Sequence, residues 1–114
     1  MISKPMRDKV LKRDDGQCWH CGETEAISIQ HRANRGMGGS KLRDRLDNLM
    51  VLCSAMNLAI ESDSVQAGYA KDYGWKLNSW DDYSKPVFDN QRGKWFNLNL
   101  DGSKSETEAP SYLI

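Results

Sequence analysis

The sequence predicts a small α+β domain, and three stretches of the chain carry this prediction. The chain has 114 residues, enough for one domain with a modest core and too short for two. Apolar residues recur at helical spacing in residues 3–13, whereas they alternate with polar residues in 26–31, as in a half-buried strand. Residues 86–100 indicate two strands around a polar turn. There is no internal repeat, so one mixed domain of helices and short strands is expected.

The first helix is expected over residues 3–13. Ser3 is a suitable N-terminal cap, and Pro5 suits the first turn, where the helix needs no backbone N–H donor. Asp15 and Gly16 end the pattern. The apolar positions that recur at helical spacing are Met6, Val10 and Leu11.

The centre of the chain is expected to contain two strands joined by a long loop. In residues 26–31, Ile27 and Ile29 belong to one face of a strand and their polar neighbours to the other. Residues 34–45 are polar and rich in glycine, which is typical of a loop. Residues 48–53 then form a short apolar run that indicates the second strand.

Two helices and a hairpin are expected after these strands. One helix begins in residues 55–63, and another spans 64–75 with Gly74 as its stop signal. The last residues have the composition of a flexible tail. The predicted organisation is a single domain over 1–103, with a core over 17–64 and a C-terminal helix and hairpin over 65–103, and a flexible tail over 104–114.

Composition limits the classes of function. No apolar run approaches the length needed to span a membrane, and the N-terminus lacks the apolar core of a signal peptide. We therefore expect an intracellular, cytoplasmic protein without a membrane partner. The net charge is zero, but basic residues gather in two stretches and acidic residues follow later, an arrangement that suits phosphate contacts as well as ordinary solvated faces. The basic residues are Lys4, Arg7, Lys9, Lys12 and Arg13, then Arg32, Arg35, Lys41, Arg43 and Arg45.

Three cysteines suggest thiols rather than a disulfide framework, because the number is odd. Cys18 and Cys21 stand in CWHCG and have the spacing of half a metal site. Cys53 is the third thiol, but the residue three positions later is Met56, where a complete second half would have cysteine or histidine. A thioether is a poor zinc ligand compared with a thiolate.

The order of knuckle, strand with histidine, glycine-rich loop, strand and helix resembles the HNH endonucleases, also called ββα-metal or His-Me finger nucleases. The matching stretches are CWHCG, QHRANRGMGGS, DNLMVLC and MNLAIESD. The similarity is greatest to small phage HNH proteins, whose C-terminal hairpin also resembles KWFNLNLDGS. It covers most of residues 5–103. The fold that this resemblance implies is a ββα-metal domain with an N-terminal helix, a cysteine knuckle and a C-terminal hairpin.

The resemblance implies a catalytic site. His31 matches the general base that activates water, and Asn48 matches the strand asparagine that holds the loop. Gln30, Asn57 and Glu61 match the ligands of Mg²⁺ or another divalent cation. Asn57 and Glu61 are four residues apart and would share a helix face. Gln30 and Asn57 are neutral where the family usually has imidazole or acid, so the cation would be held weakly and completed by a DNA phosphate.

The resemblance also implies a structural Zn²⁺ on Cys18, Cys21 and Cys53, with Met56 where the fourth thiolate is expected. Two outcomes stay open: zinc on three thiolates with water as the fourth ligand, or a metal-free knuckle in which Met56 packs against Trp19. DNA contacts are expected from four basic residues, with solvent exposure as the alternative role. These residues are Arg32, Arg35, Lys41 and Arg43.

The expected function is binding of DNA and metal-dependent hydrolysis of its phosphodiester bonds, as weak cleavage or nicking. In a phage-encoded protein this activity would act in the host cytoplasm. The alternative is a catalytically inactive HNH fold that binds DNA or a protein partner. A protein partner, such as an inhibited host factor, would meet the acidic C-terminal half.

Overall fold

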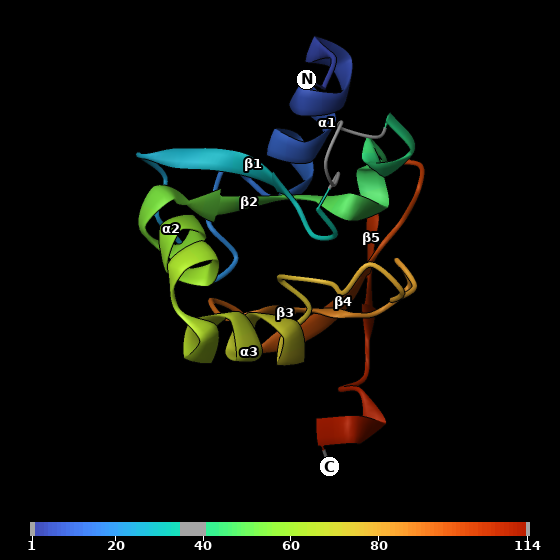
Figure 1. Cartoon of the computed structure of the whole chain (residues 1–114). Helices are drawn as coiled ribbons and strands as arrows, with labels where there is room; N and C mark the ends of the chain where they lie inside the picture. Colours follow the sequence, from blue (N-terminus) through green and yellow to red (C-terminus); the bar gives the residue numbers. More distant parts are fainter. Residues whose placement is uncertain (1, 35–40, 114) are drawn as a thin grey trace.

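The computed structural model describes residues 2–34 and 41–113 and shows an α+β domain (Figure 1). The described part contains three α-helices and two small antiparallel sheets. No described helix has the length and apolar character needed to cross a membrane. The elements are α1 (Lys4–Arg13), β1 (Ile27–His31), β2 (Leu49–Cys53), α2 (Ser54–Ser62), α3 (Ser64–Asp72), β3 (Val87–Asp89), β4 (Lys94–Leu98) and β5 (Lys104–Thr107), with short 3-10 helices at Lys41–Arg43, Leu46–Asn48 and Ser111–Leu113.

The first helix forms as the sequence predicts. Ser3 is its N-cap, and its side chain accepts a hydrogen bond from the backbone N–H of Met6. At the other end, Arg13 and Asp14 fasten the helix to the first sheet. The Arg13 guanidinium donates to the carbonyls of Leu46 and Leu49, and the Asp14 carboxylate accepts from the Val51 N–H. Arg13 is buried, and its hydrogen bonds hold the end of α1 against β2 and the turn before it.

Strands β1 and β2 pair in an antiparallel ladder that runs from Ile27 opposite Cys53 to His31 opposite Leu49. All five residues of β2 are buried, because apolar groups cover both of its faces. Leu49 and Val51 pack with Val10 of α1, whereas Met50 and Leu52 join the larger core on the other side. Figure 1 shows the β1–β2 pair between α1 on one side and α3, β3 and β4 on the other.

Helices α2 and α3 meet at Asp63, which caps α3 by accepting from the N–H groups of Val65 and Gln66. The α3 helix ends near Gly74, as expected from the sequence. Gly74 has φ +78°, and a Cβ built there would clash with the carbonyl oxygen of Pro86. This position therefore lets the chain following α3 approach the segment that enters β3.

The second sheet has the order β3–β4–β5 and contains the expected hairpin. Its turn is held by Asp89, whose side chain accepts from the N–H groups of Gln91 and Arg92. One expectation is wrong here. Residues 104–107, assigned to a flexible tail, form β5 and pair with β4 from Leu98 opposite Lys104 to Trp95 opposite Thr107. Pairing with β4 supplies the order that the polar composition of this segment does not indicate.

Candidate metal centre and histidine site

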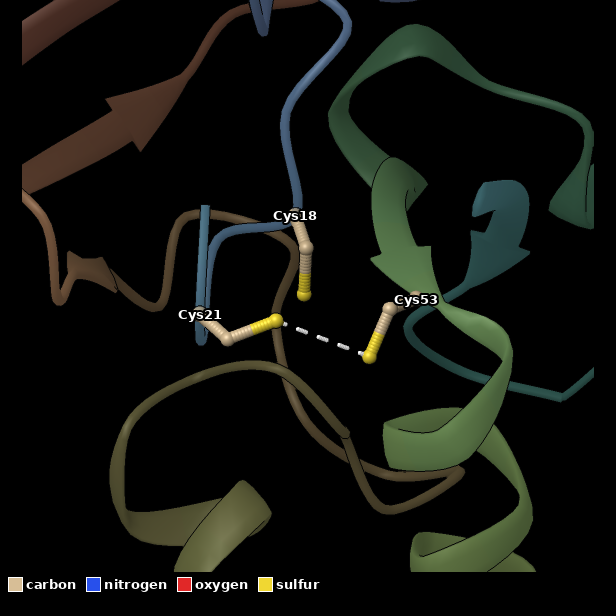
Figure 2. Close-up of side chains that lie close together, drawn as sticks. All are labelled: Cys18, Cys21 and Cys53. Carbon is tan, nitrogen blue, oxygen red and sulfur yellow. Dashed lines mark hydrogen bonds between the residues drawn. The ribbon is translucent and has the colours of Figure 1, made fainter. Parts of the chain in front are cut away.

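The three cysteines lie together at the junction of the two sheets (Figure 2). Cys18 and Cys21 come from the loop that follows α1, and Cys53 ends β2, so segments far apart in sequence meet here. Their sulfur atoms all lie within 4.8 Å of one another, and Cys21 Sγ is 3.7 Å from Cys53 Sγ. Cys18 and Cys53 are buried and Cys21 is exposed. The knuckle predicted from CWHCG is thus brought to the third cysteine.

This cluster has dimensions that fit a zinc ion. Two thiolates bound tetrahedrally at about 2.3 Å from zinc are separated by about 3.8 Å, close to the separation of Cys21 and Cys53. The cluster could hold a metal such as zinc, with three sulfur ligands. Among the described histidine, cysteine, aspartate and glutamate residues, these three form the group of three or more that could hold an ion.

Two residues beside the cluster bear on the fourth ligand position. Met56 is buried in the same apolar cluster as Trp19, and its backbone N–H donates to Cys53 Sγ at 3.3 Å. His20 packs edge-on against Trp75, with ring centroids 5.2 Å apart. The Nδ1 atom of His20 is buried and has no hydrogen-bond partner within the described structure. The buried position of Met56 beside Trp19 is compatible with both outcomes left open by the sequence: zinc on three thiolates with water as the fourth ligand, and a metal-free knuckle.

Burial raises the pKa of the Cys18 thiol to about 11, although nearby backbone N–H groups act in the opposite direction. In the metal-free protein this thiol is protonated at neutral pH. Because a metal binds the thiolate, metal uptake must displace the proton from Cys18.

The candidate base, His31, ends β1 and is half-buried. Its Nε2 atom lies 2.7 Å from Oδ1 of Asp44. Asp44 belongs to the segment between the strands and was not singled out from the sequence. The motif around His31 gave no signal for it, since the two residues are thirteen positions apart in the chain. The ring of His31 thus has a carboxylate partner.

Asn48, the candidate for holding the loop, joins two parts of the chain through its side-chain amide. It is completely buried, and its Oδ1 accepts from the Ala33 N–H at 2.8 Å. Its Nδ2 donates to the carbonyls of Ala33 and Arg43, at 3.1 and 2.9 Å. One amide therefore joins the residue two positions after His31 to the residue before Asp44.

Arg32 differs from its expected role in DNA contact. Its exposed fraction is 0%, and its guanidinium donates four hydrogen bonds to backbone carbonyls. Burial lowers its pKa to about 10, so the group stays charged at neutral pH. A guanidinium enclosed in this way holds the protein together and does not present itself to a phosphate. The carbonyls belong to Gly74, Asp47, Tyr83 and Lys85, at distances of 2.6 to 3.0 Å.

The other three basic residues expected to contact DNA differ in how much of each the structure describes. Arg43 donates to the Tyr83 hydroxyl at 2.8 Å and to the Ser79 carbonyl at 3.1 Å. Lys41 begins a short 3-10 helix, and its side chain is outside the described part of the structure. Arg35 lies outside the described residues. Arg43, which precedes Asp44 in the chain, therefore has its guanidinium engaged by Tyr83 and Ser79.

The expected cation ligands are not joined by any contact within the described structure. The Gln30 side chain donates to Ser28 Oγ at 2.6 Å, along its own strand. Asn57 is half-buried and Glu61 is exposed, both on α2. Neither His31 nor Glu61 belongs to a described group of three histidine, cysteine or acidic ligands. Oxygen donors are present at these three positions, with one negative charge among them.

Comparison of the chain with protein-family models, with curated proteins and with solved structures found no match. The class of protein is therefore defined by the fold and the cysteine cluster alone: an α+β domain with a site that could hold a metal.

Proposed function

We propose that this protein is a DNA-binding endonuclease of the HNH type that hydrolyses phosphodiester bonds with a divalent cation, as a weak or nicking enzyme. The observation that carries the proposal is the placement of His31. It ends β1, the segment after it is tied down by Asn48, and β2 leads directly into α2. This is the order of parts that a ββα-metal centre requires.

In this function, His31 accepts a proton from the attacking water. Asn48 keeps the segment between β1 and β2 in place, and Asn57 and Glu61, with Gln30 or the DNA phosphate, hold Mg²⁺ or a similar ion. These donors are oxygen atoms, as Mg²⁺ prefers, and their low charge suits an ion that is bound largely through the substrate. The bound cation would stabilise negative charge on the scissile phosphate and on the leaving oxygen.

In this function the cysteine cluster has a structural role and takes no part in the reaction. Cys18, Cys21 and Cys53 would hold Zn²⁺ and fasten the knuckle to the end of β2, close to the start of α2. Zinc at this position would be structural, because two of its three ligands, Cys18 and Cys53, lie in the packed core with Trp19 and Met56.

A second function is favoured by the low charge and the existing hydrogen bond of the proposed cation ligands. The Gln30 amide is hydrogen-bonded to Ser28, and the Asn57 and Glu61 positions supply a single charge. A chain of this kind could act without catalysis, as an HNH fold that binds DNA or a protein partner.

Nicking of supercoiled plasmid separates the two functions. Purified protein is incubated with plasmid and Mg²⁺, Mn²⁺ or Ni²⁺, beside His31→Ala and His31→Gln. We expect the wild-type protein to nick and both variants to lose about 100-fold or more of this activity. Equal nicking by all three would show a contaminating nuclease and would reject the enzyme.

Binding is measured separately, with labelled DNA in the presence of a chelator. Binding without nicking would favour the inactive DNA-binding module. Absence of both activities would favour a protein partner.

A further inference from the structure

The strongest unassigned contact near the proposed site is that between His31 and Asp44. The Nε2 to Oδ1 distance is 2.7 Å, which is in the range of a charge-assisted hydrogen bond. The side chains are 22% and 13% exposed, so both groups are largely withdrawn from water. A contact of this kind restricts the imidazole ring more than an exposed surface pair would.

Asp44 is held firmly on both sides along the chain. The Arg43 carbonyl accepts from the buried Asn48 side chain, and the Arg45 N–H donates to the same carbonyl at 3.0 Å. The Asn48 N–H in turn donates to the Arg45 carbonyl at 2.9 Å. The backbone at Asp44 is thereby placed by the same asparagine that ties the residues after His31.

The flanking arginines add a second restraint, because both of them pack on Tyr83. The Arg45 guanidinium lies 4.2 Å from the centre of the Tyr83 ring, and Arg43 donates to the hydroxyl of that tyrosine. Arg45 also forms a two-bond pair with Asp47. Side-chain contacts therefore fix both residues that flank Asp44 in the chain.

We propose that Asp44 is a positioning residue for His31 in phosphodiester hydrolysis: it accepts the Nε2–H of the neutral ring and so leaves Nδ1 as the nitrogen that takes the proton from water. A neutral imidazole carries its proton on one nitrogen and its lone pair on the other. When His31 takes a proton, the adjacent carboxylate stabilises the imidazolium that forms, as a carboxylate does beside other catalytic histidines. This inference rests on the proposed function, since it assigns a role within that reaction.

The kinetic test uses Asp44→Ala and Asp44→Asn, with Asp82→Asn as a control. Asp82 is an exposed acid close to Arg45, and it accepts from the Ser84 N–H, so its amide variant removes one charge from the same region without touching His31. We expect Asp44→Ala to lower kcat about 10- to 100-fold, with unchanged DNA affinity in chelator. Asp44→Asn should retain part of the rate because its amide oxygen can still accept from Nε2–H.

A second readout requires no activity. The chain has two histidines, so the side-chain N–H signals of His31 are identified in a ¹⁵N-labelled sample by comparison with His31→Ala. An imidazole proton held in a hydrogen bond exchanges slowly enough to be seen. We expect an Nε2–H signal in wild-type protein, its loss in Asp44→Ala and its presence in Asp82→Asn, with all variants folded by circular dichroism.

The two measurements keep this inference distinct from the proposed function. If the wild type does not nick DNA, the proposed function fails, although the N–H signal still reports the contact. If the wild type nicks through His31 and folded Asp44→Ala nicks at the same rate, the positioning role is overturned. Persistence of the His31 N–H signal in Asp44→Ala would overturn it as well.

Discussion

Replacing Arg32 with methionine should destabilise the whole domain. Methionine can replace the aliphatic part of the arginine side chain but cannot donate to the four carbonyls that the guanidinium contacts. A hydrogen bond to a charged group contributes about 1.5–3 kcal/mol, so four of them represent roughly 6–12 kcal/mol. Removing the buried charge returns several kcal/mol of desolvation cost. The net loss should be about 3–5 kcal/mol, a large part of the 5–15 kcal/mol typical of a domain.

The assay is equilibrium unfolding in urea, followed by circular dichroism, for wild type, Arg32→Met and Arg7→Met. Arg7 is exposed on α1, so its variant should stay within about 0.5 kcal/mol of wild type. DNA affinity is measured alongside. If Arg32→Met retained wild-type stability and lost DNA affinity, the structural role would be refuted and the original expectation of a phosphate contact restored.

Three further outcomes concern the metal sites. In metal-free protein the raised pKa of Cys18 means that the unfolded chain loses this proton at lower pH than the folded one, so stability should fall between pH 9 and 11 by at most roughly 2–3 kcal/mol. Urea titrations at several pH values measure this, and a decline of the same size in Cys18→Ser would contradict it. Met56→Cys should raise zinc affinity about 10-fold or more, measured against a chromophoric chelator, because a thiolate replaces a thioether; an unchanged affinity would mean that position 56 does not reach the metal. Gln30→Asp should lower the Mg²⁺ concentration needed for half-maximal nicking because it adds a charge, and an unchanged Mg²⁺ dependence would remove Gln30 from the proposed ligands.

Local sequence signals predicted the elements whose order comes from short-range interactions. The cap at Ser3, the strand at β1 and the turn before β4 each have a signal in neighbouring residues, and all three form, although the burial of β1 does not alternate along the strand. Strand β5 was missed because its sequence, KSET, carries almost no apolar pattern. Its order comes from a partner strand, and single-sequence propensity does not contain that information.

The site residues were predictable to a different extent. Spacing indicated Cys18 and Cys21 as half a metal site, the resemblance added Cys53, and the structure brings the three cysteines together. Arg32 was misjudged because a charged residue in a basic stretch gives no sign of burial, and its carbonyl partners come from positions 47 to 85.

Asp44 could not be found from the sequence at all. Its contact with His31 depends on where residues 43–45 lie, and the Asn48 amide and arginine packing on Tyr83 hold these residues. Such a placement follows from tertiary contacts, which spacing along the chain does not encode.

The sulfur of Cys53 has a practical consequence for handling the protein. It accepts a hydrogen bond from the Met56 N–H and so serves as the N-cap of α2, besides belonging to the cysteine cluster. A thiol-alkylating reagent that reached this atom would block a metal ligand and also remove a helix cap worth about 1 kcal/mol. Samples prepared with iodoacetamide would then differ from reduced samples in the helix that carries Asn57 and Glu61, so the two preparations should not be treated as interchangeable.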